Sequence, residues 1–249
     1  MGTWLGLLLP FAMVFARTTA FVFVLPLFSS RSAPAMLRAG LGVLLTVFFA
    51  HLVPAPGGSG ASVSAILGVV LLTREILCGL AIGLGARLIF NAVQQGGILI
   101  GRQMGFAMAS VIDPSTGQET QPFGMYMDIV FTLLFFVAGG HHLLIRLVQR
   151  SFDVMPVGGE LDFGVLAAGV LAAGSAMLLF ALKLAAPVLA GFLVLAVVLG
   201  VLARVLPEMN VLLMSLPLRV AVGLLLAMAM VPVLSSFTEE IGGWINRFL

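Results

Sequence analysis

Charged side chains are scarce in this sequence, since only 9% of its 249 residues are Asp, Glu, Lys or Arg. The basic residues are scattered and form no cluster interleaved with aromatic side chains, which excludes a conventional nucleic-acid-binding surface. Cysteine occurs once, as Cys78 within an apolar stretch, which excludes an internal disulfide and a metal site built from several cysteines. We therefore predict no nucleic-acid partner, no metal and no other cofactor.

Sequence motifs of enzymes are missing as well. The chain contains no G-x-S-x-G, no H-E-x-x-H, no pair of intramembrane aspartates and no nucleotide-binding motif. Its histidine pair, His141-His142, would point about 100° apart on a helix, so the two rings cannot chelate a metal as an i, i+4 pair does. Capping of the last carbonyls of a helix is the alternative role for this pair. The sequence thus predicts a protein that is not an enzyme.

Apolar residues are abundant, at 61% of the chain, and the mean hydropathy is +1.21. Unbroken apolar stretches of roughly 15 to 38 residues are near or above the length of about 20 that a helix needs to cross a bilayer. The strands of a membrane barrel would instead alternate polar and apolar residues. Because backbone polar groups must be satisfied within the bilayer, we predict an all-α, polytopic membrane protein.

About six apolar helical segments are expected in this protein. The fifth segment is too long for one simple crossing, and Lys183 and Pro187 mark where it could bend or break. The expected segments are 4–28, 39–53, 66–93, 125–147, 165–202 and 211–236.

Seven charged residues lie inside these segments, where a charge that faces lipid costs a few kcal/mol. Such residues must be paired, lie near the membrane surface or face water. A transporter would use them as an ion relay, whereas a subunit of an assembly would pair them with neighbouring chains. These residues are Arg17, Arg74, Glu75, Arg87, Asp128, Lys183 and Arg219.

Three glycines, Gly97, Gly101 and Gly105, recur at four-residue spacing in the polar-leaning stretch 94–123. On a helix this spacing places them on one face, where a second helix can approach closely. Gly79 and Gly83 repeat the pattern in segment 66–93. The alternative for the first three is a flexible glycine-rich loop with chance spacing.

A short apolar run, 106–112, follows these glycines and belongs to none of the long segments. It ends at the turn Asp113-Pro114-Ser115-Thr116-Gly117. The 13 methionines of the chain add flexible side chains of the kind that fill irregular gaps. The run is consistent with a re-entrant or plugging loop, and equally with a helix extension that ends in an Asx-type turn.

Several motifs along nearly the whole chain resemble, in their order and spacing, those of one family. They are Gly101-Arg102-Gln103-Met104-Gly105-Phe106, Val111-Ile112-Asp113-Pro114, Gly139-Gly140-His141-His142 and Ser151-Phe152-x-x-x-Pro156-x-Gly158. The family comprises the R subunit of the bacterial flagellar export gate (FliR) and its counterpart in virulence secretion, the T subunit of the injectisome (SctT). Two of these motifs favour the flagellar branch of the family: Gln103-Met104-Gly105 and Asp113-Pro114.

The resemblance implies a subunit that assembles with P and Q subunits (FliP and FliQ) into a helical, pore-like entry for unfolded proteins that leave the cytoplasm. It implies that the apolar segments form helical hairpins and that an autocleaving switch protein (FlhB) docks on the assembly. The implied location is the bacterial inner membrane at the flagellar basal body. Residues 1–164, with the glycine-rich and plug region 94–123, would resemble a P subunit, and residues 165–249 a Q-like hairpin and tail.

The resemblance also suggests a plug inside the closed gate, formed by Phe106, Met108, Val111 and Ile112. Apolar side chains at such a constriction would exclude water and ions. The family often has an aromatic residue where this chain has Met108 and Val111, which implies a smaller seal. Three alternatives stay open: an injectisome T subunit, a secondary transporter for small molecules or ions with helices broken at prolines, and a purely structural membrane subunit.

Overall fold

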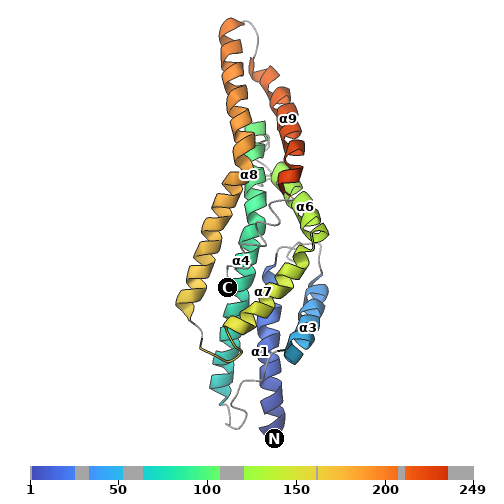
Figure 1. Ribbon diagram of the computed structural model, residues 1–249, viewed down its shortest axis with the longest axis vertical. Coiled ribbons are helices and arrows are strands. Elements are labelled where there is room, and N and C mark those ends of the chain that lie inside the picture. The colour runs from blue at the N-terminus through green and yellow to red at the C-terminus, as the bar shows by residue number, and fades with distance from the viewer. Residues whose placement is uncertain are drawn as a thin grey trace, which may run out of the picture. The chain divides into compact units, whose positions relative to one another are not determined.

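The computed structural model of the chain describes residues 2–25, 34–52, 64–106, 121–160, 162–206 and 211–234. Every element among these residues is an α-helix, which confirms the predicted all-α fold (Figure 1). The helices are α1 (Gly2–Val24), α3 (Ala35–Leu52), α4 (Ala65–Met104), α6 (Pro122–Val137), α7 (Gly140–Val154), α8 (Phe163–Val205) and α9 (Val211–Ala229).

Three of the described helices, α3, α4 and α8, are long and apolar enough to cross a membrane. Counting α6 and α7 as one broken span raises this number to four. Two shorter apolar stretches, Leu8–Val24 and Met214–Ala229, belong to α1 and α9. At 1.5 Å per residue, α4 and α8 are each about 60 Å long, roughly twice the thickness of the hydrocarbon layer.

The expected segment 125–147 is two helices rather than one. The chain breaks after α6, and Gly139 takes a left-handed conformation with φ 73° before α7 begins. Gly139 adopts this conformation without strain because it lacks a Cβ. His141 and His142 therefore lie in the first turn of α7. The prediction that they lie at the carboxyl end of a helix, where they would cap its last carbonyls, is wrong.

Two other helices run further than expected. Helix α4 continues past position 93 to Met104, because the glycines in this stretch are packed against neighbouring helices instead of forming a loop. Helix α8 continues through Pro187, so of the two outcomes predicted near this proline, a bend or a break, the break is wrong. A proline removes only one backbone hydrogen bond from a helix. The helix continues because the residues beside Pro187 are packed in the core, where Ala185 and Val188 are fully buried.

The chain packs as two compact units, each with its own core. Unit 1 takes its described residues from 1–88 and 139–175, and unit 2 from 89–138 and 176–241. This division concerns packing within the chain. The P-like character of residues 1–164 and the Q-like character of residues 165–249 stay predictions.

Unit 1 is built on α1, which packs against α3. Their contact includes a hydrogen bond between the hydroxyls of Thr18 and Thr46 (2.8 Å). Helix α7 covers the same core with an apolar face that includes Leu144 and Phe152, and the Phe152 ring lies 5.5 Å from that of Phe49 on α3. The exposed side chains of α7 are mostly polar, although Ile145 and Val154 are exposed as well.

Unit 2 contains an aromatic cluster between α4 and α6. The ring of Phe90 lies 5.4 Å from Phe131 and 4.9 Å from Phe135, both in edge-on arrangements that favour aromatic pairs. Helices α8 and α9 lie side by side as a hairpin, with Gly191 facing Leu226 (Figure 1).

Candidate functional site

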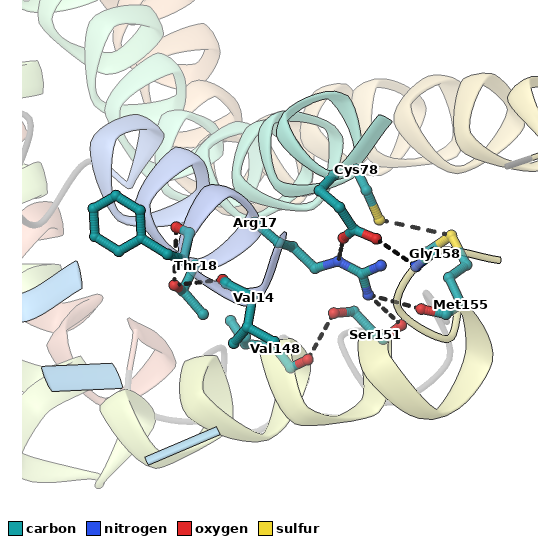
Figure 2. A network of polar contacts seen from close by, with 10 residues as sticks. Val14, Arg17, Thr18, Cys78, Val148, Ser151, Met155 and Gly158 are labelled. Atoms are coloured by element: carbon teal, nitrogen blue, oxygen red, sulfur yellow. Dashed lines mark hydrogen bonds and ion pairs between the residues drawn. The ribbon is translucent and has the colours of Figure 1, made fainter. Parts of the chain in front are cut away.

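A buried guanidinium lies within unit 1. Arg17 on α1 is 1% exposed, and its Nε donates to Glu75 Oε2 on α4 over 2.6 Å. Its Nη1 donates to the carbonyl oxygens of Ser151 (3.0 Å) and Met155 (2.8 Å) at the end of α7. The guanidinium also lies over the Phe152 ring, 4.5 Å from its centroid. Figure 2 shows Arg17 reaching from α1 toward Ser151 and Met155.

The carboxylate of Glu75 is satisfied on both oxygens. Oε2 accepts from Arg17, and Oε1 accepts from the backbone N–H of Gly158 over 3.1 Å. Gly158 has φ 75°, a left-handed conformation that glycine adopts without strain. One ion pair thus joins α1, α4, the end of α7 and the turn that follows α7.

The physical role of this pair follows from its surroundings. The last carbonyls of a helix have no partner within the helix and carry partial negative charge, so a cation at this point is favourable. The side chains of Arg17 and Glu75 are only 2% and 5% exposed, and two charges so far from water are stable only when they neutralise each other. The arrangement is suited to holding three helices in one register.

Cys78 lies one turn after Glu75, as a buried small residue of the core. Its Sγ is 3.8 Å from Met155 Sδ. The thiol therefore packs beside the ion pair and helps to fill the space between α4 and the end of α7.

Two glycines let α4 approach α1 beside this pair. A Cβ on Gly79 would collide with the carbonyl oxygen of Arg17. A Cβ on Gly83 would lie 3.0 Å from Val24 Cβ and 3.1 Å from the carbonyl oxygen of Phe21. Because neither glycine has a side chain, α1 and α4 can lie close enough together for Arg17 to reach Glu75.

In unit 2 a second pair of glycines brings α4 close to α6. A Cβ on Gly97 would lie 2.9 Å from Gly124 Cα, and one on Gly101 would lie 3.1 Å from Phe123 Cβ. Gly124 is itself constrained, because its own Cβ would lie 2.8 Å from Ile98 Cγ1. The two helices are therefore in contact through their backbones.

Replacing Gly101 with leucine is expected to separate α4 from α6, because Phe123 leaves no room for the side chain. Overpacking of this kind costs typically about 1–3 kcal/mol. The measurement is the yield of monodisperse protein after extraction in mild detergent. Leu99→Ala is the control, since Leu99 is half-exposed on the same helix. Equal yields from the two variants would contradict the assignment of Gly101 as a packing residue.

Gly105 has a different position from Gly97 and Gly101, because it lies just beyond the end of α4 with φ 93°. Its N–H donates to the carbonyl oxygen of Arg102 (3.1 Å), and the N–H of Phe106 donates to that of Gly101 (3.2 Å). This is the Schellman arrangement that ends a helix. The three glycines therefore do not share one helical face.

Of the predicted plug residues, the structure describes Phe106 alone. Phe106 is half-buried, and its ring lies beside Gly101, where an added Cβ would be 3.8 Å from Phe106 Cδ2. Met108, Val111 and Ile112 lie outside the described residues, so the plug stays a prediction.

The other five charged residues are less buried than Arg17 and Glu75. Arg219 donates from Nη1 to the carbonyl oxygen of Gln103 (3.4 Å), and the Lys183 ammonium lies 5.6 Å from the centroid of the Phe180 ring. The remaining three differ in exposure: Arg87 is exposed, and Arg74 and Asp128 are half-exposed.

Several partners in these contacts were not foreseen from the sequence. The carbonyl groups of Ser151 and Met155 and the N–H of Gly158 are backbone groups, which no pattern of side chains reveals. Gly223 on α9 was also missed: a Cβ there would lie 2.5 Å from Met104 Cγ. It has no second glycine at four-residue spacing, so no motif marks it. Among the described residues, no three His, Cys, Asp or Glu side chains form a group that could hold a metal ion.

Apolar helices long enough to cross a membrane, held together by a buried ion pair and by glycines at their contacts, define a polytopic α-helical membrane protein. The chain belongs to a family described as "Bacterial export proteins, family 1", whose sequence profile matches residues 8–242.

Individual relatives resemble the chain along most of their length. It is 31% identical to the flagellar biosynthetic protein FliR of Escherichia coli K12 over 246 residues, which are 99% of this chain and 93% of that protein. It is 33% identical to the protein of the same name from Bacillus subtilis, covering 91% of this chain and 87% of that one. The Yop proteins translocation protein T of Yersinia pestis is 28% identical over 88% of this chain and 84% of its own length.

Proposed function

We propose that this chain is a subunit of the bacterial flagellar type III protein export gate, where it helps to form the closed entry pore for unfolded flagellar proteins. The observation that carries the proposal is the similarity to the Escherichia coli FliR protein, which extends over 99% of this chain. The role is architectural, and the buried pair of Arg17 and Glu75 maintains the helix arrangement that such a subunit needs.

The second candidate is the T subunit of a virulence injectisome. It is favoured by the similarity to the Yersinia translocation protein T. The flagellar relatives from Escherichia coli and Bacillus subtilis have higher identity, at 31% and 33% against 28%, and therefore support the flagellar role better.

The partners in this proposal are the P and Q subunits (FliP and FliQ), the switch protein FlhB and the exported chains themselves. The location is the bacterial inner membrane at the flagellar basal body. The lengths of α4 and α8 support an assembly that projects beyond the bilayer, because helices of about 60 Å exceed the hydrocarbon layer of about 30 Å. Within the assembly, residues 1–164 take the P-like place and residues 165–249 the Q-like place.

The seal of the closed gate is assigned to Phe106, Met108, Val111 and Ile112. Their apolar side chains suit a constriction that excludes water, and a passage wide enough for an unfolded chain needs such a constriction to prevent ion leakage. The glycines at 97, 101, 79 and 83 hold the surrounding helices close.

Deletion of the gene tests the proposed function. In the bacterium that encodes this chain, the deletion should abolish swimming and remove flagellin from the culture medium, and a plasmid copy should restore both. Loss of virulence-effector secretion with normal swimming would instead establish the injectisome role. Normal swimming and normal secretion would contradict both candidates.

A further inference from the structure

Asp128 is the one charged residue of α6, a helix that is otherwise apolar apart from Tyr126 and Thr132. The side chain of Asp128 is half-buried. Among the described residues it forms no ion pair and no hydrogen bond, in contrast to Glu75, which is neutralised by Arg17. The described part of the chain therefore leaves the carboxylate of Asp128 without a cation.

The position of Asp128 within α6 makes this lack of a partner costly in a membrane. Asp128 is the seventh of the 16 residues of the helix, so about 9 Å of helix precede it and about 14 Å follow. An aspartate side chain has one methylene group, whereas Lys and Arg have stems that carry their charge several ångströms toward the membrane surface. Lipid chains supply no cation, and a carboxylate left among them is unfavourable. A partner for Asp128 must therefore come to it.

One side of α6 is already covered within unit 2. Phe131 and Phe135 are fully buried, and their rings contact that of Phe90 on α4. Gly124 lies on the same side and touches Ile98 of α4. These contacts leave the other side of α6 for a partner.

That other side exposes large apolar side chains. Four of them, at positions 125, 129, 133 and 136, recur at spacings of four, four and three residues, which places them in one ridge along the helix. Ridges of this kind pack into the grooves of a second helix. We call the whole surface the docking face of α6, and it consists of Met125, Tyr126, Ile129, Leu133, Phe136 and Val137.

Asp128 lies at the edge of the docking face. It is three residues after Met125, and side chains at this spacing are neighbours on a helix. Contact with water would also satisfy the carboxylate, but the large apolar side chains beside it suit contact with a protein. An apolar surface with a single acid at its edge is complementary to an apolar helix that carries a single cation.

We propose that the docking face of α6 binds an apolar helix of a neighbouring subunit, and that a lysine or arginine of this helix pairs with Asp128. The apolar stem of such a side chain packs along the docking face while its charged end reaches the carboxylate. The charge pair fixes the register of the two helices. This inference rests on the proposed role as a gate subunit and deepens it by naming the surface through which the chain joins the assembly.

Recovery of the partner subunits tests the charge pair. A tagged copy of the full chain replaces the native gene in its own bacterium, and the complex is extracted in mild detergent. Asp128→Asn keeps the shape of the side chain and removes its charge, so we expect a loss of about tenfold or more in the subunits that co-purify with the unaltered chain. Asp153→Asn is the matched control, because Asp153 is exposed on α7, and it should leave their recovery unchanged.

The amount of the chain itself in the membrane is measured in the same strains. Since Asp128 has no partner among the described residues, this amount should be equal for Asp128→Asn and Asp153→Asn. A selective loss of the chain in Asp128→Asn would show that the carboxylate serves the fold of this chain, which contradicts the proposal.

Photocrosslinking and charge reversal identify the partner helix. A benzophenone amino acid is placed at Ile129, which is 58% exposed on the docking face. We expect it to crosslink to another subunit, within about one helical turn of a lysine or arginine. Asp128→Lys should prevent recovery of that subunit, and replacing the identified cation with glutamate should restore most of it.

Three results would overturn the inference: normal recovery of the partner subunits from Asp128→Asn, crosslinks from position 129 only to lipid or to this chain, or no gain from the reversed charge pair. Swimming separates the two proposals. If Asp128→Asn forms an intact complex and supports normal swimming, the docking face is wrong and the export function stands. If the unaltered copy restores no swimming to the deletion strain, the proposed function fails, whatever the crosslinks show.

Discussion

Replacing Arg17 with alanine should abolish accumulation of the folded protein. The substitution leaves Glu75 as an uncompensated charge that is 4% exposed, and it removes the donor to the carbonyl oxygens of Ser151 and Met155. Breaking a buried pair from one side costs about 3–5 kcal/mol, which is a large fraction of the stability of most domains. The measurement is the amount of monodisperse protein in detergent extracts, followed by its midpoint of thermal unfolding.

Two variants make this result specific to the pair. Arg74→Ala removes the neighbouring, half-exposed cation and should leave the yield nearly unchanged. The double variant Arg17→Met with Glu75→Met removes both charges, and it should recover some of the yield lost in Arg17→Ala, because no charge then stays buried alone. A yield for Arg17→Ala equal to that of Arg74→Ala would show that the pair does not hold the helices together.

Gly79→Ala is the second change with a large expected effect. Its Cβ would collide with the carbonyl oxygen of Arg17, a backbone atom that cannot rotate away. The collision would push α4 from α1 and lengthen the contact between Arg17 and Glu75. We expect a loss at the upper end of the range for overpacking, about 3 kcal/mol. The unfolding midpoint of the purified protein measures it.

Gly40→Ala is the matched control for this substitution. Gly40 also lies in a helix of unit 1, but a Cβ there would meet nothing within 4 Å. Alanine favours a helix over glycine by about 1 kcal/mol, so this variant should be neutral or more stable. If both variants shifted the midpoint equally, steric contact at Gly79 would not be the cause.

The sequence identified Arg17 and Glu75 as charges that need partners, but it could not pair them with each other. They are 58 residues apart, and in an oligomeric membrane protein a buried charge can equally be neutralised by a neighbouring chain. The other acceptors of Arg17 are backbone carbonyls, whose positions depend on where α7 ends. Only the tertiary structure shows that these carbonyls lie beside Arg17.

Helix boundaries were predictable where composition changes and less predictable where packing decides. Apolar length identified the all-α membrane fold, because a bilayer leaves few alternatives. The stretch after position 93 lies outside the predicted apolar segment because it is rich in glycine and glutamine. Gly97 and Gly101 nevertheless continue α4, as their four-residue spacing predicted, since α6 fills the space beside them. Conversely, the apolar segment at 125–147 showed no charge at its centre, and the break at Gly139 depends on a left-handed backbone conformation.

The most direct test of the central claim is the composition and mass of the complex that contains this chain after extraction from its own membrane in mild detergent. The account predicts that an affinity-tagged copy elutes as a particle several times heavier than the 26.1 kDa chain and carries FliP and FliQ as stable components. A homogeneous monomer or homo-oligomer without these partners, from cells that swim normally, would contradict it.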